Sequence, residues 1–531
     1  MNKIINKLTY ILGLTAVIFT AGCEDIPLEV TSLNTDRLFS PIGIEAKVTN
    51  KTQVTLDWVL NANAESYTIE VFADDSLTFS GSPVMTIEGI ENSQLPYTIL
   101  TGLIGQTNYS VRVKAVGANI TESKWMGIFF KTDSEQIMTA VVDSEIQAHQ
   151  VILNWTPGET ATNIVLTAGE NVVSHEVTED EITAGKAIVT GLLEDASYTA
   201  KLMKDSKIRG SANFVTLIDL TAAGTIVVNP GDDLGSIILG AAADSRIVIV
   251  TTSDNDEYFV GGATLELDKN ISIRGYSKIN KPILHVHFRP MVSNTSLTVR
   301  DVILNGSSNG TLRDHLLQFT VTDTQSGDYY FKDCVITNYN KSLVAGASGI
   351  VVSINSFSLI NCKVSNILTN SADCIDVRSG CIVNATLENS TFTNCAPARD
   401  FFRLDDSSAA FPDKTSTITV NKCSFSGVSN DASRRLLYVR FVNNNISFNN
   451  NVVANSLGCY TNNAATIATF SGNNYFNADN FITYTGTLIG VVTDLGIYTK
   501  LDPGFADVAN ANLTISNTTL LEKAVGANIS W

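Results

Sequence analysis

Proline and charged residues are scarce in this chain of 531 residues, which contains 11 prolines and only 17% charged residues. Long runs of Ala, Glu, Lys and Leu, which are typical of long helices and coiled coils, are absent. Hydrophobic residues make up 44% of the chain, which favours an ordered, core-forming protein over a disordered one. Val, Ile, Thr, Phe, Tyr and Asn recur instead, and this bias predicts strands and turns.

The apolar run near the N-terminus, YILGLTAVIF, is too short to span a bilayer. Lys3 and Lys7 precede the run and TAGC follows it, as in a targeting segment that is removed. The segment resembles a bacterial lipoprotein signal, although Thr20 stands where leucine is usual. The resemblance implies cleavage before Cys23 and acylation of Cys23.

The formal charge of −18 becomes −20 once Lys3 and Lys7 leave with the signal. A chain this acidic argues against nucleic acid as a partner. The stretch EDIPLE after Cys23 resembles the export tags of surface lipoproteins in glycan-utilising bacteria. That resemblance implies a protein anchored in the outer membrane by lipid and facing the outside.

Two segments carry strand patterns of β-sandwich modules. In the first, VTLDWVL and SYTIEVF are expected strands, and LTGLIGQTNYSVRVKAV resembles the tyrosine-corner region of a fibronectin type III module, with Tyr109 at the corner. A weaker copy places Tyr198 at the equivalent position. Trp58 and Trp155 are predicted to be core residues rather than platforms for a sugar.

The rest of the chain repeats one pattern: an apolar residue, any residue, Asp or Asn, often Cys, alternating apolar residues, then Asn or Gly. Its steps of 22 to 33 residues are too short for sandwich or propeller units and too rich in strands for helical repeats. They predict coils of a right-handed parallel β-helix, which stack to bury a continuous core. The equivalent apolar anchors are Val299, Phe331, Leu359, Leu387, Val420, Phe448 and Phe470.

Stacked coils would place equivalent side chains about 4.8 Å apart. Cys334, Cys362 and Cys423 share one inward position and are predicted to be small buried hydrophobic residues, while disulfides among the seven cysteines after Cys23 stay open. A ladder of amide hydrogen bonds is predicted for Asn338, Asn366, Asn394 and Asn455.

The two ends of this region resemble those of known β-helices. IVVNPGDDLGSIILG resembles the first coil and short capping helix of pectate-lyase-like β-helices, and LDPGFADVANANLTI resembles a closing segment that includes a final strand. The expected fold is all-β, with two fibronectin type III-like sandwiches followed by a right-handed parallel β-helix. The expected segments are a signal at 1–22, a linker at 23–40, sandwiches at 41–133 and 134–218, and the β-helix at 219–531.

Arginines recur in the strands CIDVRS, DFFRLDD and LLYVRF. Alternation predicts Val377, Leu404 and Phe441 inward, which turns one arginine of each strand outward. Either Asp376 and Asp405 neutralise these arginines in a surface ladder, or the arginines bind the carboxylates of an acidic polysaccharide. The predicted binding residues are Arg378, Arg399, Arg403 and Arg440, with Tyr438 stacking on a sugar ring.

A lyase is an alternative, because β-elimination of a uronate needs a cation at the carboxylate and a base. Arg403 or Arg378 would be the catalytic base in the manner of pectate lyases. Asp376, Asp405 and Asp406 would hold calcium, the cofactor of such a lyase.

A hydrolase is disfavoured. SADCIDVRSG resembles a polygalacturonase strand that reads DDCI, but Ala372 replaces the first acid and leaves Asp373 alone. Inverting hydrolysis requires a pair of carboxylates.

The whole chain, including RDFFRLD, resembles surface lipoproteins that glycan-utilising bacteria place beside pectin-degrading enzymes. The resemblance implies fold and location more strongly than activity, because β-helices support many functions. We expect a monomer that binds an acidic, pectin-like polysaccharide. A polyuronate lyase is the second hypothesis, and a non-catalytic structural or adhesive rod is the third.

Overall fold

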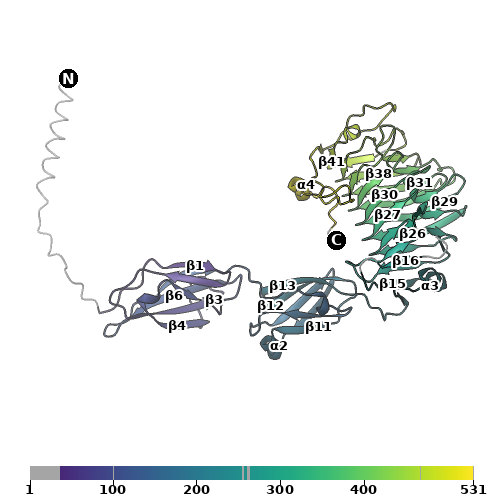
Figure 1. Cartoon of the computed structure of the whole chain (residues 1–531). Helices are drawn as coiled ribbons and strands as arrows, with labels where there is room; N and C mark the ends of the chain where they lie inside the picture. The colour runs from purple at the N-terminus through teal and green to yellow at the C-terminus, as the bar shows by residue number, and fades with distance from the viewer. Residues whose placement is uncertain (1–35, 100, 254–255, 260–263, 467, 530–531) are drawn as a thin grey trace, which may run out of the picture. The chain divides into compact units, whose positions relative to one another are not determined.

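The computed structural model describes residues 36–531 except 100, 254–255, 260–263, 467 and 530–531 (Figure 1). The chain forms two compact units that meet in sequence between Leu217 and Ile218. The predicted signal and Cys23 lie outside the described residues. Within the described residues, no helix is both long enough and apolar enough to cross a membrane.

The first unit begins with an antiparallel sandwich. Tyr109 is buried, and its hydroxyl accepts a hydrogen bond from the Ile104 amide at 2.9 Å, which is the predicted tyrosine corner. Trp58 packs edge-on against Tyr67 in the core. One sheet has the order β1 (Glu45–Thr49), β2 (Gln53–Asp57) and β5 (Tyr97–Ile99), and the other β4 (Met85–Ile90), β3 (Ser66–Ala73), β6 (Asn108–Val116) and β7 (Met126–Lys131), with the 3-10 turn η1 (Asn92–Gln94) before β5.

A second sandwich of the same kind follows. The Tyr198 hydroxyl accepts a hydrogen bond from the Leu193 amide at 2.9 Å, and Trp155 is buried in the core. Both tryptophans are therefore core residues, as predicted. The sheets are β11 (Lys186–Thr190) with β8 (Gln150–Asn154), and β10 (Asn171–Glu176), β9 (Asn163–Ala168), β12 (Ser197–Lys204) and β13 (Lys207–Val215), with η2 (Asp143–Glu145) and α2 (Glu179–Ala184) between strands.

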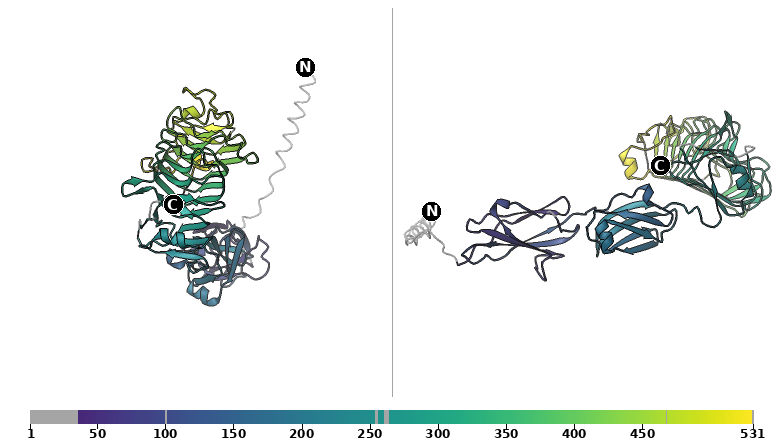
Figure 2. Two further views of the ribbon diagram at one scale, coloured as in Figure 1. Left: turned by 90° about the vertical axis from the view of Figure 1, so that its right-hand side faces the viewer. Right: turned by 60° about the horizontal axis from the view of Figure 1, so that its bottom comes forward.

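The second unit is a parallel β-helix of three sheets, whose coils stack from teal to yellow in Figure 2. The first sheet contains β14 (Thr225–Val228), β15 (Ser245–Ile249), β18 (Ile271–Gly275), β21 (Leu297–Arg300), β26 (Thr324–Lys332), β29 (Val352–Ile360), β32 (Cys381–Glu388), β35 (Ser416–Asn421), β38 (Asn444–Asn449) and β40 (Ala468–Ser471).

The other two sheets close each coil. The second sheet contains β16 (Glu257–Phe259), β19 (Ile283–His285), β22 (Ile303–Asn305), β27 (Val335–Tyr339), β30 (Lys363–Ile367), β33 (Thr391–Cys395), β36 (Ser424–Ser426), β39 (Val452–Ala454), β41 (Asn473–Phe476) and β42 (Tyr498–Thr499). The third contains β17 (Leu265–Leu267), β20 (Phe288–Pro290), β25 (His315–Phe319), β28 (Ser342–Gly346), β31 (Ile375–Val377), β34 (Phe402–Leu404) and β37 (Leu437–Val439). A hairpin of β23 (Ser307–Ser308) and β24 (Thr311–Leu312) and the turn η3 (Asp479–Phe481) complete the unit.

The seven predicted anchors pair with one another in register along the first sheet, from Val299 opposite Phe331 to Phe448 opposite Phe470. Ile273 of β18 pairs with Val299 and extends the column by one coil. All these residues except Phe470 belong to one buried hydrophobic core cluster, and the partly buried Phe470 packs against it. The repeat in the sequence therefore corresponds to the physical stacking of coils.

The cysteines of the β-helix are buried free thiols throughout the described residues. Cys334, Cys362 and Cys423 lie in the core at the predicted inward position. Burial raises the pKa of the Cys423 thiol to about 12, so these thiols stay neutral and act as small hydrophobic side chains.

The two ends of the β-helix are covered differently. The predicted capping helix is α3 (Leu234–Gly240), which buries Leu234 and Ile238 in the core. The predicted final strand is wrong: from 513 to 517 the chain is irregular, and α4 (Thr518–Glu522) follows. The reason is packing, because Ile515 and Leu520 form a small hydrophobic cluster with Val452 of β39 instead of pairing as a strand.

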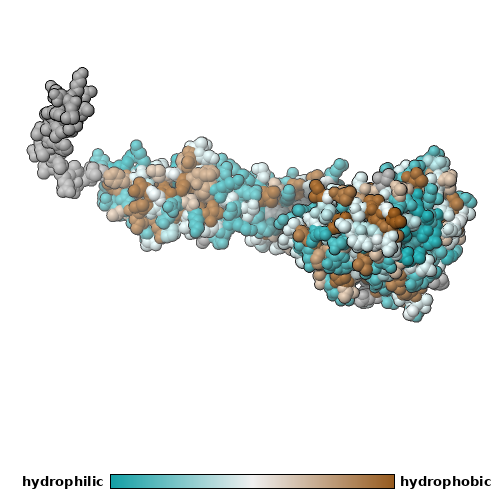
Figure 3. Space-filling model, turned by 90° about the horizontal axis from the view of Figure 1, so that it is seen from above, coloured by the Kyte–Doolittle hydropathy of each residue, from teal (hydrophilic) through white to brown (hydrophobic). Residues whose placement is uncertain are grey.

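Apolar residues lie scattered among hydrophilic ones on the face of the β-helix that Figure 3 shows. Scattered apolar residues of this kind are normal on a protein surface.

Candidate functional site

The predicted arginines lie in or directly beside the last three strands of the third sheet, β31, β34 and β37. In this sheet Asp376 pairs with Arg403, and Arg403 pairs with Tyr438. Val377 and Leu404 point inward as predicted, but their partner on the third strand is Val439, not Phe441. Phe441 is buried as predicted, but because Val439 is the residue in register, Arg440 aligns with Arg378 and not with Arg403.

The outward side chains of these strands form two columns, and each column mixes residues of different charge. Asp376, Arg403 and Tyr438 form one column, and the residues after Val377, Leu404 and Val439 form the next, which reads Arg378, Asp405 and Arg440. Positive and negative side chains thus alternate between neighbouring coils. This alternation removes the repulsion that three stacked arginines would produce.

Each outward arginine is held by a carboxylate. The Nε and Nη2 atoms of Arg378 each donate to Asp376 at 2.8 Å. Those of Arg403 donate to Asp405 at 2.7 and 2.9 Å, and Arg440 Nε donates to Asp405 at 3.2 Å. These are two-point, charge-assisted bonds, which fix the orientation of a guanidinium plane.

Asp373 lies beneath the arginines with its side chain only 1% exposed. It accepts hydrogen bonds from Arg399 Nε and Arg403 Nη1, both at 3.1 Å, and Arg378 Nη2 lies 3.9 Å away. A buried carboxylate needs such compensation. The sequence drew attention to Asp373 only as an acid without a neighbouring acid, so its role as a shared partner of three arginines was missed.

Asp400 has the same role for the neighbouring arginine and was also missed. It is buried and accepts hydrogen bonds from Arg435 Nε at 3.0 Å and Nη2 at 2.6 Å. The Arg399–Asp400 pair in the sequence is the signal that could have indicated it. We use the name arginine face for Arg378, Arg399, Arg403, Arg435, Arg440 and Tyr438.

Tyr438 lies among the guanidinium groups. The guanidinium carbon of Arg435 is 3.8 Å from the ring centroid, that of Arg440 5.1 Å and that of Arg403 5.8 Å. Such contacts are cation–π interactions. The stacking of Tyr438 on a sugar ring stays a prediction.

Ion pairing strengthens the charged forms on the arginine face. Hydrogen bonds that Arg403 donates to Asp405 raise the pKa of Arg403, and those that Arg378 donates to Asp376 raise the pKa of Arg378. Burial alone would raise the pKa of Asp405, but the hydrogen bonds from Arg403 and Arg440 outweigh burial and hold this pKa below its usual range. A general base must lose its proton, so these shifts oppose the predicted catalytic role of Arg403 and Arg378.

The carboxylates predicted to bind calcium have partners within the protein. Among the described residues, no group of three or more His, Cys, Asp or Glu side chains is arranged to hold a metal ion. Asp376 and Asp405 are occupied by arginines, and Asp406 accepts hydrogen bonds from Ser408. Pairing with arginine competes with the binding of calcium by Asp376 and Asp405, and calcium at these residues stays a prediction.

The arginines differ in what they leave free. All three guanidinium nitrogens of Arg403 and Arg435 donate to protein atoms. In the described part of the chain, Nη1 of Arg378, Arg399 and Arg440 makes no hydrogen bond. These three side chains are also the most exposed, at 28%, 30% and 33%. They are the arginines of the face that can contact a ligand.

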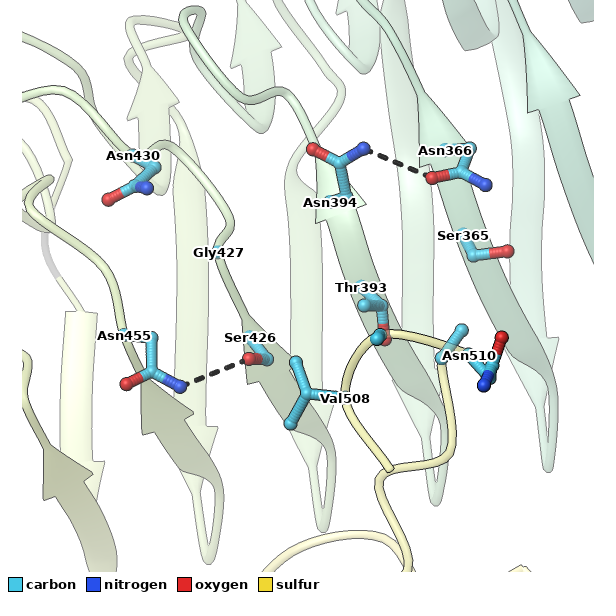
Figure 4. Close-up of a pocket in the computed structure, with 12 residues that line it drawn as sticks. Ser365, Asn366, Thr393, Asn394, Ser426, Gly427, Asn430, Asn455, Val508 and Asn510 are labelled. Carbon is cyan, nitrogen blue, oxygen red and sulfur yellow. Dashed lines mark hydrogen bonds between the residues drawn. The ribbon is translucent and has the colours of Figure 1, made fainter. Parts of the chain in front are cut away.

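A groove of about 520 Å³ lies over the outer side of the second sheet (Figure 4). The predicted amide ladder forms one wall: Asn366 donates to Asn338 at 3.3 Å, and Asn394 donates to Asn366 at 3.0 Å. The lining side chains are uncharged throughout: Ser365, Asn366, Thr393, Asn394, Ser426, Asn430, Asn455, Val508, Ala509, Asn510 and Ala511, together with Gly427.

The prediction that Asn455 continues the ladder is wrong. Thr393 pairs with Ser426, and Ser426 with Ala454, so Gly427 stands between Asn394 and Asn455. Asn455 donates to Ser426 at 3.5 Å instead, as the dashed line in Figure 4 shows. The ladder is interrupted because glycine has no side-chain amide.

Two family models match parts of the β-helix. A domain of unknown function (DUF4957) matches residues 256–395, and a second domain of unknown function (DUF5123) matches residues 418–529. The two matched ranges include every residue of the groove and every residue of the arginine face other than Arg399 and Arg403, which lie between the ranges. A search of curated proteins finds no match to the chain.

Solved structures similar to this chain contain fibronectin modules. A two-domain fibronectin type III segment from chicken tenascin shares 17% identity, covering 33% of this chain and 98% of that chain, with a TM-score of 0.23. The central fibronectin-III array of RIM-binding protein shares 17% identity, covering 38% and 67%, with a TM-score of 0.14. The strands and tyrosine corners of the two sandwiches are by themselves typical of fibronectin type III modules.

Proposed function

We propose that this chain is a lipid-anchored surface protein whose β-helix binds an acidic polysaccharide through the arginine face, without cleaving it. The observation that carries the proposal is the set of arginines with free Nη1 groups, Arg378, Arg399 and Arg440. Each is already fixed in orientation by a carboxylate. Fixed donors lose little conformational entropy on binding, which favours affinity.

A uronate chain suits these groups chemically. It presents carboxylates at regular intervals, and a guanidinium donates to a carboxylate with good geometry. The face contains five arginines against Asp373, Asp376, Asp400 and Asp405, so one positive charge is left over. In a chain of charge −18, this is a local site that an anionic ligand can approach.

Binding is favoured over cleavage by the same geometry. The pKa values of Arg403 and Arg378 are raised, and Asp376 and Asp405 are paired with arginines instead of being open to calcium. The lyase hypothesis needs the opposite of both conditions. Anchoring through Cys23, display outside the cell and the role of the two sandwiches as a spacer in sequence belong to the proposal and rest on the sequence resemblance.

Affinity gel electrophoresis tests the proposal. The chain without its signal should be retarded by polygalacturonate and much less by the fully methyl-esterified polymer, because esterification removes the carboxylates. Arg440→Gln should weaken the retardation, whereas Lys47→Gln on the first sandwich should not. Equal mobility with and without polygalacturonate would refute acidic-glycan binding.

A further inference from the structure

The interruption of the amide ladder coincides with a second unusual feature, an unpartnered hydroxyl. Thr393 is only 7% exposed, yet its Oγ1 atom has no hydrogen-bond partner within the described structure. Its neighbour one coil earlier, Ser365, does have one, since its hydroxyl lies 2.9 Å from that of Thr337. A buried polar group without a partner is unfavourable unless a ligand or water satisfies it.

Gly427 follows Ser426, which pairs with Thr393, and so lies beside Asn394 without a side chain. Every ladder asparagine here has a left-handed backbone, with φ of 53° at Asn394 and 51° at Asn455, and Gly427 has a φ of 66°. A Cβ atom on Gly427 would meet no atom within 4 Å. Asparagine therefore fits at position 427 both in backbone conformation and in space. Because glycine stands there instead, a gap separates the amide of Asn394 from the amide of Asn455.

A turn at the C-terminal end of the chain forms the other wall. Asn510 lines the groove, and this turn is held by hydrogen bonds from Asn510 to Asp507 and by the bridge between Asp507 and Asn512. The volume of about 520 Å³ lies within the usual range of small-ligand sites. Amides and hydroxyls supply both donors and acceptors, and the lining carries no charge.

We infer that this groove binds an uncharged, hydroxyl-rich ligand, a neutral sugar residue, at the gap that Gly427 leaves between Asn394 and Asn455. A sugar hydroxyl would occupy the place of the missing amide and bond with Thr393 Oγ1. The site is separate from the arginine face in both location and chemistry: it lies on the second sheet and recognises hydroxyl groups, whereas the face lies on the third sheet and recognises carboxylates.

Saturation-transfer NMR on the whole chain without its signal tests the inference, because it detects weak binding. The probes are uncharged monosaccharides: galactose, arabinose, xylose, glucose and rhamnose. The wild type should give signals with at least one of them. Gly427→Asn should abolish these signals while the thermal unfolding midpoint stays the same or rises, because the added amide completes the ladder. Thr393→Val should also weaken the signals without loss of stability.

Gly310→Asn is the matched control. Gly310 is also a glycine with positive φ and open space around its missing Cβ, but it does not line the groove. This variant should keep the sugar signals. No signal with the wild type, or signals that persist in Gly427→Asn, would overturn the inference. Gly427→Asn should leave retardation by polygalacturonate unchanged, and Arg440→Gln should leave the sugar signals unchanged, so the two proposed sites can fail independently.

Discussion

Asp376 and Arg403 occupy the same position of consecutive coils, so a negative side chain lies directly beside a positive one on adjacent parallel strands. Each of the two is then bonded to another partner, Asp376 to Arg378 and Arg403 to Asp405. The arginine face is therefore a network and not a row of separate charges. Removal of one member should affect several others.

The buried member of this network should matter most for stability. Asp373→Asn would leave Arg399 and Arg403 without their shared carboxylate, in a position where the side chain is 1% exposed. We expect a loss of about 3–5 kcal/mol in the free energy of unfolding of the β-helix. Asp406→Asn, at an exposed carboxylate bonded to Ser408, should change it by less than about 0.5 kcal/mol. Equal effects of the two changes on the urea-unfolding midpoint would contradict this role of Asp373.

Asp405 should make the stability of the β-helix depend on pH in acid. Its pKa is lower in the folded chain than in the unfolded chain, so its contribution is fully present above about pH 4 and is lost as the pH falls through the folded-state value. At neutral pH, Asp405→Asn should cost roughly 1.5–3 kcal/mol through weaker hydrogen bonds to Arg403 and Arg440. Thermal unfolding as a function of pH checks this: the gap between wild type and variant should close in acid, and a constant gap would disprove the assignment.

The arginine face should neither bind calcium nor cleave polygalacturonate. The carboxylates Asp376 and Asp405 are engaged by arginines, so added calcium should not shift the thermal unfolding midpoint of the β-helix. Incubation with polygalacturonate and calcium should produce no absorbance from unsaturated uronates, since the raised pKa of Arg403 opposes its action as a base. Absorbance that appears in the wild type and disappears in Arg403→Ala would instead establish the lyase hypothesis.

The fold could be predicted from sequence to a large extent because its core repeats. The anchors from Val299 to Phe470 follow one pattern, and their register in the first sheet matches the pattern. The charged columns were harder, because Val439 and Phe441 are both apolar and both buried, so alternation alone cannot choose which one pairs with Leu404. Because Val439, and not Phe441, pairs with Leu404, Arg440 belongs to the column of Arg378 and Asp405 and not to that of Arg403.

The groove could not be predicted for a different reason. Thr393 and Asn510 are more than a hundred positions apart in sequence, and the C-terminal turn comes near the second sheet only because Ile515 and Leu520 pack on β39. The interruption at Gly427 is visible in the sequence as the glycine in CSFSG, where the repeats directly before and after it have Asn394 and Asn455. Its meaning depends on knowing which residues lie on either side of it in space.

The central claim is that the free Nη1 groups of the arginine face recognise uronate carboxylates. Isothermal titration of the whole chain without its signal with an oligogalacturonate tests it most directly, using the double variant Arg378→Gln/Arg440→Gln, in which glutamine can still donate to Asp376 and Asp405. Two lost charge-assisted bonds, each contributing about 1.5–3 kcal/mol, predict binding at least roughly a hundredfold weaker. Lys47→Gln should bind like the wild type. Equal affinity of the double variant and the wild type would contradict the account.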